Sequence, residues 1–339
     1  MKSEEIARIA NVSRSTVSRV INNYSNVPEE TRQKVMKVIE EYNYIPNYSA
    51  RNLAGKSNNI ITLFIYDEER EGNYTHRWQG SKSPYFMKMI AELIDAAKKY
   101  QYIISVYVIT EQAEYDFAAS LFQSRAISGG IFAGFESQKE QLESLMRQGF
   151  RMVILDPPEG LEEAEKACCV YSDNKAGACA AVRYLIHNGH RRIGHIAGDD
   201  RRSSQDRLQG YRQAMEEAGI QAPPDWIELG LYQDEAAYQA ARHLVEDKNV
   251  EALFVANDSM AIAVFRALRD MGKRVPEDIS VVGFDNSEIL PYMGIELTTV
   301  EISQKELAAT LVKSICEEHS AKRRICPARL IEKKTVRKK

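Results

Sequence analysis

The chain has 339 residues, of which 44% are apolar and 27% are charged, and its formal net charge is −3. This length and composition predict a soluble globular protein with room for about two or three domains. No apolar run approaches the roughly 18 residues that a membrane span requires, and no signal peptide opens the chain, so we expect a cytoplasmic protein without a membrane partner. The five cysteines form no CxxC pair, which indicates reduced thiols.

The first 44 residues carry three short amphipathic patterns. Ser3 and Ser13 can each cap a helix, and Pro28 can open a third one. The apolar side chains expected to face a shared core are Ile6, Ile9 and Ala10 in the first helix, Val17, Val20 and Ile21 in the second, and Val35, Val38, Ile39 and Tyr42 in the third. Two helices joined by a tight turn, with polar donors on the second, predict a helix-turn-helix unit that reads the major groove.

The outward face of the second helix, over residues 14–22, consists of Arg, Ser and Asn side chains. Such side chains suit base edges and phosphates, although a lone polar helix face can simply be solvated. The charge distribution favours DNA: residues 1–56 contain nine Lys or Arg and six Asp or Glu, whereas the remainder contains 36 and 42. We therefore expect the basic N-terminal residues to contact the DNA phosphates.

From residue 58 onward, apolar strand-like runs alternate with helical patterns. The predicted strands are 60–66, 103–109, 130–133, 152–155, 193–197, 227–229, 253–256 and 279–284, with a second series beginning at Val170. The predicted helices are 85–100, 115–122, 139–148, 175–187, 204–217, 235–245 and 261–271. This alternation predicts two parallel, doubly wound sheets. Ligands of such sheets bind at the carboxyl ends of the strands, where two facing lobes form a cleft.

Polar and aromatic side chains follow several of these strands. Carboxylates can accept from several hydroxyls, and an aromatic ring can cover the C–H face of a sugar, so the set suits a polyhydroxylated ligand. For each Asp or Asn the alternative is that it caps the next helix. The candidate residues are Asp156, Tyr171, Arg207, Tyr232, Asn257 and Asp285.

Four N-terminal motifs resemble the signature of the lactose-repressor (LacI/GalR) family of bacterial transcriptional regulators. They are ANVS at 10–13, TVSRVIN at 16–22, ETR at 30–32 and YIPN at 44–47, and residues 50–56 resemble the hinge helix of that family. Further motifs look like its effector-binding core, which is similar to periplasmic sugar-binding proteins. These are GHRRI at 189–193, DRLQGY at 206–211, AND at 256–258, VPEDISVVGFD at 275–285 and LTTV at 297–300.

The resemblance implies specific roles in DNA binding. Arg14 and Ser15 occupy the positions that distinguish one operator from another, Arg19 reads the major groove, and Leu53 with Ala54 enters the minor groove. A hinge helix this short is marginal alone, so it should order only on DNA and against its dimer mate. The implied DNA-binding residues are Ser13, Arg14, Ser15, Thr16, Ser18, Arg19, Asn22, Asn47, Ala50, Leu53 and Ala54, and the six candidates above fall on effector-contacting positions.

The same resemblance implies a domain map. We expect a small all-α helix-turn-helix head over 1–44, a hinge over 45–57 and an α/β core over 58–339, with two periplasmic-binding-protein-like lobes. The first lobe is expected at about 58–168 and 302–326, and the second at about 169–299 and 327–339. A helix over 303–318 and a strand over 328–332 resemble the segments that return the chain to each lobe in turn.

The sequence therefore predicts a DNA-binding transcriptional regulator, by resemblance a repressor, that is associated with the nucleoid when bound. Its expected partners are a pseudopalindromic double-stranded operator, a second copy of the chain, and a small effector that is a sugar or sugar derivative. Residues 333–339 are too short and charged for a tetramerising leucine-heptad tail, which favours a homodimer. We expect no cofactor and no catalytic residue, and the spacing of His187, His190 and His195 matches no standard metal site.

Several alternatives remain open. Within the regulator class, the effector could be a purine, or control could come from a phosphoprotein that docks on the first lobe. A sugar receptor without DNA regulation would explain the polar strand ends but not the head. A sugar-modifying enzyme would need a placed acid, base or nucleophile that the sequence does not offer. The identity of the effector, and whether it releases or strengthens DNA binding, stay undecided.

One insertion departs from the family pattern. Residues 68–82 precede the segment Ser83-Pro84-Tyr85-Phe86, where the family usually has a short loop and an Asn-Pro-Phe-Phe segment. The insertion contains Arg70, His76, Arg77 and Trp78. One hypothesis is that it covers the effector site and favours an acidic or phosphorylated sugar; the alternative is a solvated surface loop.

Overall fold

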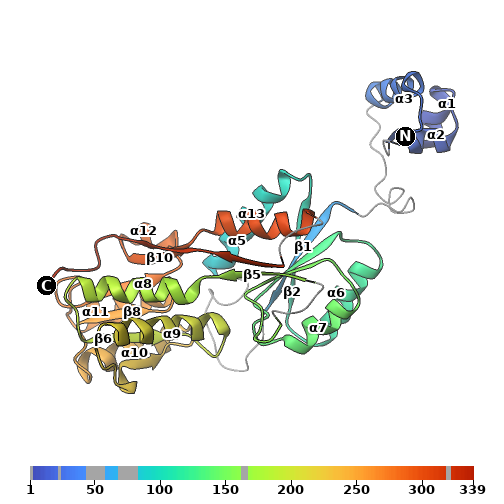
Figure 1. Ribbon diagram of the computed structural model, residues 1–339. Helices are drawn as coiled ribbons and strands as arrows, with labels where there is room; N and C mark the ends of the chain where they lie inside the picture. Colours follow the sequence, from blue (N-terminus) through green and yellow to red (C-terminus); the bar gives the residue numbers. More distant parts are fainter. Residues whose placement is uncertain (1–2, 22–23, 43–57, 68–82, 162–166, 318–321) are drawn as a thin grey trace. The chain divides into compact units, whose positions relative to one another are not determined.

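The computed structural model describes residues 3–21, 24–42, 58–67, 83–161, 167–317 and 322–339 (Figure 1). The chain divides into two compact units, residues 1–59 with 121–128 and residues 60–120 with 129–339. Asn58 belongs to the first unit, where its Nδ2 atom donates to the carbonyl oxygen of Ala126 at 3.1 Å.

Three helices form the head of the first unit: α1 (Ser3–Ile9), α2 (Arg14–Ile21) and α3 (Glu29–Glu41). The expected shared core is present, because side chains from all three helices are buried together. Its members are Ile6, Ala7, Ala10, Val17, Val20, Val27, Val35 and Val38. The predicted cap of α2 is also confirmed, since the Ser13 Oγ atom accepts a hydrogen bond from the Thr16 backbone N–H at 3.1 Å.

Two side chains predicted to be inward lie at the surface instead. Tyr42 is 48% exposed because it follows the last residue of α3 as its C-cap and no longer continues the helical face. Ile9 is 40% exposed in the last turn of α1, whereas Ala7 of the same helix is buried. The apolar face of α1 is therefore rotated toward Ala7 relative to the prediction.

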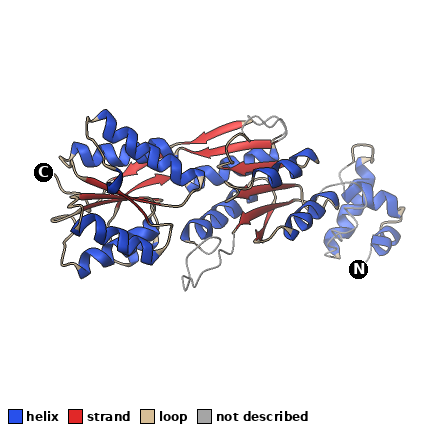
Figure 2. Ribbon diagram, turned by 90° about the horizontal axis from the view of Figure 1, so that it is seen from below, coloured by secondary structure: helices blue, strands red, loops and turns tan. Residues whose placement is uncertain are grey.

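The second unit contains two six-stranded sheets, and each defines one lobe (Figure 2). The first sheet has the order β11-β5-β4-β3-β1-β2, and all its neighbouring strands are parallel. Its strands are β1 (Ile60–Tyr66), β2 (Ile103–Ile109), β3 (Gly129–Ala133), β4 (Met152–Leu155), β5 (Ala167–Ser172) and β11 (Arg323–Cys326).

The second sheet has the order β12-β10-β9-β8-β6-β7 and is parallel except for the antiparallel pair of β10 and β12. Its strands are β6 (Ile193–Ala197), β7 (Ile227–Leu229), β8 (Ala252–Val255), β9 (Ser280–Phe284), β10 (Thr298–Ile302) and β12 (Ala328–Ile331). Strands such as β6 and β9 are buried along their whole length, as expected for parallel strands covered by helices on both faces. The predicted pair of doubly wound sheets is thus confirmed.

Helices connect these strands. They are α5 (Pro84–Lys98), α6 (Ala113–Gln123), α7 (Lys139–Arg147), α8 (Asn174–His187), α9 (Arg202–Glu217), α10 (Asp234–Glu246), α11 (Asp258–Asp270), α12 (Ile289–Tyr292) and α13 (Gln304–Cys316), with a short 3-10 turn η2 (Pro224–Trp226). Several begin at capping side chains: Ser83 before α5, Asp173 before α8 and Ser303 before α13 each accept a backbone N–H. Along the chain, α13 returns to pack on α5 of the first lobe, and β12 returns to the second sheet.

Three strands differ from the sequence prediction, and one of them is β10, whose residues were noted only as part of the LTTV motif. Val170 was expected to begin the second series, but its strand β5 pairs with β4 and β11 in the first sheet. Alternation along a chain does not reveal the sheet to which a strand belongs, and β5 follows β4 without a described helix between them. Strand β11 was not predicted, because an edge strand that begins with Arg323 and Arg324 lacks the apolar run on which the prediction depends.

A buried carboxylate anchors the C-terminal end of the chain. Glu251, just before β8, is 7% exposed and accepts hydrogen bonds from the backbone N–H groups of Arg191 at 2.6 Å and Arg192 at 3.1 Å. It also forms an ion pair with the Lys339 ammonium. Burial alone would raise the pKa of Glu251, but these hydrogen bonds and the ammonium outweigh it and lower the pKa to about 2.

We predict that Glu251→Gln destabilises the protein at pH 7 by about 1.5 to 3 kcal/mol, because two buried N–H groups lose a charged acceptor. Since the pKa falls from 4.5 to about 2 on folding, this stabilisation is complete above pH 4.5 and is lost as the pH decreases toward 2. Urea unfolding of both proteins across this range measures the difference. Glu246→Gln is the control, because the ion pair between Glu246 and Arg242 is exposed, with both side chains at 45%, and contributes little to stability. Equal effects of the two substitutions on the free energy of unfolding would refute the prediction.

Candidate DNA-binding face and effector site

Helix α2 presents the predicted polar face to solvent. Its buried Val17 and Val20 fix the rotation of the helix in the core of the head. The Ser13 Oγ atom lies 2.7 Å from the Ser15 hydroxyl and 2.8 Å from the Thr16 hydroxyl, so these groups cluster at the start of the helix. The predicted DNA-binding residues that are exposed are Ser13, Arg14, Ser15, Ser18 and Arg19, and Thr16 is half-buried.

Arg14 forms an ion pair across the head. Its guanidinium lies 3.2 Å from the Glu4 carboxylate of α1, and the two side chains are 66% and 55% exposed. An exposed pair of this kind contributes little to stability, so Arg14 remains free to exchange Glu4 for a base edge or a phosphate.

Part of the predicted DNA-binding site falls on residues that the structure does not describe. Asn22, Asn47, Ala50, Leu53 and Ala54 lie outside the described residues. The insertion at 68–82 lies outside them as well.

Three of the predicted effector residues have a strained backbone. Asp156 follows β4 with a φ of 46°, Tyr232 lies beyond β7 with a φ of 56°, and Asp285 follows β9 with a φ of 111°. Residues other than glycine rarely adopt positive φ, and they keep it where surrounding contacts hold them, often at binding sites. The carboxyl ends of the strands therefore carry stored strain at the predicted positions.

Arg207 is the centre of this region. It belongs to α9 and is 8% exposed. Its Nε atom donates to the Asn174 side-chain oxygen at 2.9 Å, one terminal nitrogen donates to the Ala256 carbonyl, and the other lies 3.5 Å from the Asp285 carboxylate. The guanidinium carbon lies 3.7 Å from the centre of the Phe284 ring. One cation thus joins α8, α9 and the ends of β8 and β9.

The carboxyl groups near Arg207 have raised pKa values. Burial raises the pKa of Asp285 to about 6, although Arg207 opposes the shift. Burial, and then the charge of Glu136, raise the pKa of Asp156 to about 7 even though the Ser172 N–H donates to it at 2.7 Å. A buried carboxyl group of this kind is stabilised by any further hydrogen-bond donor, including a ligand hydroxyl.

Glu136 was missed by the sequence analysis. It lies between β3 and α7 in the first lobe and accepts from the Ser203 N–H at 2.6 Å and the Ser203 hydroxyl at 3.1 Å. Ser203 lies in the first turn of α9, so a carboxyl group of the first lobe caps a helix of the second. Burial raises the pKa of Glu136, and the charge of Arg201 opposes this.

Tyr85 was also missed. It lies in the first turn of α5, and its pKa is raised well above 10 by burial and then by the charges of Asp156 and Asp285. These two carboxyls end strands of different sheets, so the tyrosine lies close to both lobes. The segment Ser83-Pro84-Tyr85-Phe86 was the available signal, but it was noted only as a departure from the family pattern. We name Tyr85, Glu136, Asp156, Arg201, Arg207, Tyr232 and Asp285 the polar cluster.

The remaining predicted residues have different surroundings. Tyr232 joins the polar cluster, with the Arg201 guanidinium 4.5 Å from its ring centre. Tyr171 is 6% exposed, and the guanidinium groups of Arg202 and Arg323 lie 5.2 and 4.6 Å from its ring centre. Asn257 caps α11 by accepting the Met260 N–H at 2.8 Å, which is the capping alternative considered for it.

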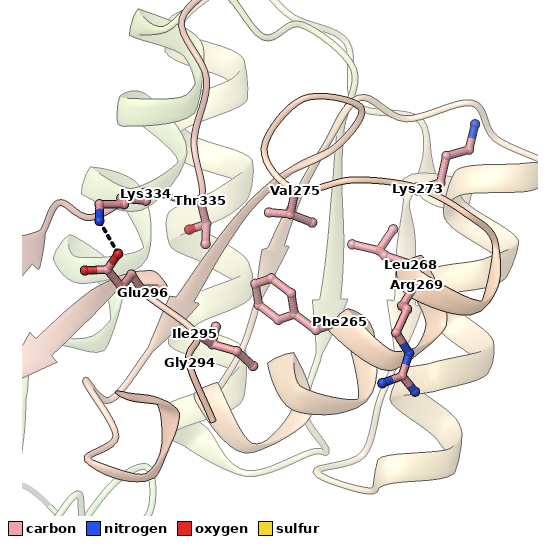
Figure 3. Close-up of a pocket in the computed structure, with 10 residues that line it drawn as sticks. All are labelled: Phe265, Leu268, Arg269, Lys273, Val275, Gly294, Ile295, Glu296, Lys334 and Thr335. Atoms are coloured by element: carbon pink, nitrogen blue, oxygen red, sulfur yellow. Dashed lines mark ion pairs between the residues drawn. The ribbon is translucent and has the colours of Figure 1, made fainter. Parts of the chain in front are cut away.

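A separate pocket of about 310 Å³ lies in the second lobe (Figure 3). Phe265 and Leu268 of α11 line it together with Lys334 and Thr335 of the C-terminal segment. Thr335 hydrogen-bonds to Val281, near the start of β9, so the pocket lies toward the end of β9 opposite to Asp285. It contains none of the predicted site residues.

Two further searches cover only the described ranges. No helix there is long and apolar enough to cross a membrane. No three His, Cys, Asp or Glu side chains in the same ranges are arranged to hold a metal ion.

Comparisons with known families match two separate segments of the chain. The model described as "Bacterial regulatory proteins, lacI family" matches residues 4–47, and that described as "Periplasmic binding protein-like domain" matches residues 182–336. The chain is 30% identical over 325 residues to the HTH-type transcriptional repressor PurR of Photobacterium profundum, covering 93% of this chain and 90% of the relative. It is 32% identical over 334 residues to the HTH-type transcriptional regulator CelR of Thermobifida fusca, covering 93% and 92%.

Solved structures agree. A complex of the transcriptional regulator CelR with cellobiose is 27% identical, with a TM-score of 0.70 over 99% of both chains. A lac repressor dimer bound to operator and the anti-inducer ONPF has a TM-score of 0.77 over 98% of both chains; at 24% identity, it supports the fold alone. These relatives are regulators rather than enzymes, in agreement with the sequence analysis. With a helix-turn-helix head, a two-lobed core and full-length relatives of this kind, the chain belongs to the lacI family of bacterial regulatory proteins and is a DNA-binding transcriptional regulator whose DNA binding responds to an effector.

Proposed function

We propose that this regulator binds a pseudopalindromic operator as a homodimer in the cytoplasm, and that a sugar or sugar derivative bound at the polar cluster switches its operator affinity. The observation that carries the proposal is the contact of Ser203, one turn before Arg207 in α9 of the second lobe, with Glu136 of the first lobe at 2.6 Å, which places Arg207 and Asp285 beside the strand ends of the first lobe. A ligand that contacts side chains of both lobes would bind best to one arrangement of the lobes. Such a difference in affinity is what an allosteric effector requires.

The chemistry of the polar cluster favours a hydroxylated ligand. Asp156 and Asp285 can accept from hydroxyl groups, while Arg207 can donate to ring or hydroxyl oxygens. Relatives of known structure include the CelR complex with cellobiose and a lacI-family regulator from Enterococcus faecium with bound ribose. These ligands belong to those proteins, and they support a sugar as the class of effector here.

Polar contacts between the lobes offer a means of switching. Glu136 of the first lobe holds Ser203 of the second, and the Lys88 ammonium of α5 lies 3.0 Å from the Glu288 carboxylate beyond β9. A change in the arrangement of the lobes would break or re-form such contacts. Through them, occupancy of the polar cluster would be coupled to the hinge that precedes the first lobe.

At the DNA, the exposed face of α2 supports major-groove reading. Arg14 and Arg19 can each donate two hydrogen bonds to the O6 and N7 atoms of guanine. Ser13, Thr16 and Ser18 can donate to phosphates, which fixes the register of the head on the duplex. Leu53 is proposed as the minor-groove wedge at the centre of the operator.

The test is selection of genomic DNA fragments by the purified full-length protein, alone and with a panel of neutral, acidic, amino and phosphorylated sugars. A pseudopalindromic site whose occupancy changes with one sugar would support the whole proposal. A specific site that responds to no sugar would favour control by a purine or a phosphoprotein. Failure to select any site, including at low salt, would overturn the DNA-binding role.

We predict that Arg14→Ala weakens operator binding by about 1 to 3 kcal/mol, because a bidentate base contact is lost. Arg14→Lys keeps the charge but not the planar fork, so it should relax discrimination among operators while leaving the salt dependence of binding nearly unchanged. Fluorescence anisotropy with the selected operator and single-base variants measures both effects. If both variants bind all the operators as the parent protein does, Arg14 does not read a base.

For the effector site, we predict that Arg207→Lys weakens binding of the responding sugar about 10- to 100-fold, because the shorter amine cannot replace the guanidinium fork. Operator binding without sugar should stay within about threefold of the parent protein. Calorimetry and operator titration measure the two quantities. The matched control is Arg212→Lys, on the exposed face of the same helix, which should change neither. An unaltered sugar affinity in Arg207→Lys would place the effector elsewhere.

Exposed apolar side chains support the homodimer. Met87 and Ile94 of α5 are 59% and 44% exposed, and Tyr292 and Met293 at α12 are 90% and 50% exposed. The ion pair of Lys88 with Glu288 brings α5 close to the start of α12, and apolar side chains grouped on a surface commonly mark a protein interface. We propose that they meet the second copy.

We predict that Tyr292→Asp weakens the dimer at least about tenfold, because an aromatic anchor is replaced by a charge at the interface. Sedimentation equilibrium over a range of protein concentrations measures the change. Leu229→Asp, at a residue that is 59% exposed on the edge strand β7, is the control and should leave the dimer intact. A dimer that persists in Tyr292→Asp, or that is lost equally in both variants, would exclude α12 as part of the interface.

A further inference from the structure

Asp258 is a buried carboxyl group that the sequence analysis did not assign to the effector site. It is the first residue of α11, directly after the cap Asn257, and its exposed fraction is 0%. Its Oδ1 atom accepts from the Thr299 hydroxyl at 2.8 Å, and its Oδ2 atom accepts from the Ser287 backbone N–H at 2.8 Å. The contacts that the described residues make with its two oxygens are thus hydrogen bonds from neutral donors.

These two contacts fix the backbone that carries Asp285. Asp285 and Asn286 both have positive φ, at 111° and 49°, which is costly for residues with side chains. The N–H of Asn286 donates to the Thr299 hydroxyl at 3.4 Å, and the N–H of Ser287 donates to Asp258. Because the Thr299 hydroxyl in turn donates to Asp258, both amides lead to the same carboxyl group.

The strand beside Asp258 is shaped to admit it. A Cβ atom at Gly283 would overlap the Asp258 Oδ1 atom and would also meet the Leu297 side chain. Glycine at this position therefore allows a carboxyl group to lie against the end of β9, immediately before Phe284 and Asp285.

The arrangement is costly to the fold. Burial and then the charge of Asp285 raise the pKa of Asp258 to about 7, against the hydrogen bonds from Ser287 and Thr299. A second buried carboxyl group near Asp285 lowers the stability of the fold, and such a cost is typical of residues that serve the geometry of a site.

We propose that Asp258 is a positioning residue, which holds the loop after β9 so that Asp285 meets Arg207 and the polar cluster is complete. Its importance for the effector rests on the proposed function, but its effect on Asp285 does not. The side chain acts through the Ser287 amide and through Thr299, and it does not itself have to touch the effector.

The experiment measures the coupling between Arg207 and Asp285 in the full-length protein without ligand. Arg207→Lys, Asp285→Asn and the double variant are made, and the midpoint of thermal unfolding of the core is determined for each. In the parent background we expect the two substitutions to be non-additive by about 3 °C or more, because they alter one interaction. In the Asp258→Asn background the non-additivity should fall below about 1 °C, because Asp285 is no longer held in place.

A merely structural role for Asp258 would lower every midpoint and leave the coupling unchanged. Thr299→Val removes the hydroxyl that joins Asn286 to Asp258 and should reduce the coupling as Asp258→Asn does, which provides a second variant if Asp258→Asn does not fold. Thr299→Ser keeps the hydroxyl and should retain the coupling. Full coupling in both Asp258→Asn and Thr299→Val would overturn the proposal. The unfolding experiment contains no sugar and no DNA, so unchanged coupling would not argue against the proposed function. Likewise, a failed operator selection would not argue against the positioning role of Asp258.

Discussion

The site depends on the contacts of one buried guanidinium group, that of Arg207, at the ends of two strands. Burying the charged Arg207 guanidinium is tolerable only if its donors are satisfied and its charge is balanced. Asn174 and the Ala256 carbonyl provide acceptors, Asp285 provides the charge, and the Phe284 ring covers one face of the guanidinium. Removing any one of them leaves a buried charge incompletely compensated. The positions of α8, β8 and β9 at this edge of the sheet are thereby tied together.

The parallel topology explains why such groups gather where they do. All strands of the first sheet run the same way, so Glu136 beyond β3 and Asp156 beyond β4 emerge at one edge. The carboxyl edge of the second sheet delivers Asp285 in the same manner. Tyr85 experiences the charge of both Asp156 and Asp285, and Glu136 reaches Ser203 across the lobes. A site assembled in this way contains residues from both lobes, which is the geometric requirement for a ligand to favour one arrangement over another.

Local sequence pattern predicted those parts of the fold that local physics determines. The bounds of β1, β2, β4, β6 and β7 were predicted to the residue, since each strand begins and ends with an apolar or aromatic residue and is followed by a polar or turn residue. The sheet to which β5 belongs depends on its neighbours in space, which alternation does not encode, and β11 is a polar edge strand. Of the polar cluster, Asp285 and Arg207 were among the residues predicted from strand ends and motifs, whereas Glu136 was not. Its partner Ser203 lies 67 residues away, and nothing near Glu136 in the sequence signals that contact.

Strain and burial in this region have a common physical origin. Asp156 and Asp285 combine positive φ with raised pKa values, and Asp258 lies fully buried beneath the loop that carries Asp285. Each feature costs free energy that the packed strands must offset, so the protein would be more stable with apolar residues and regular turns at these positions. The hydroxylated ligand proposed above would supply further donors to Asp156 and Asp285, and its binding energy would depend on how well the lobes present these two carboxyl groups. In the proposed function, a ligand that offsets these costs better in one arrangement of the lobes would favour that arrangement of the core.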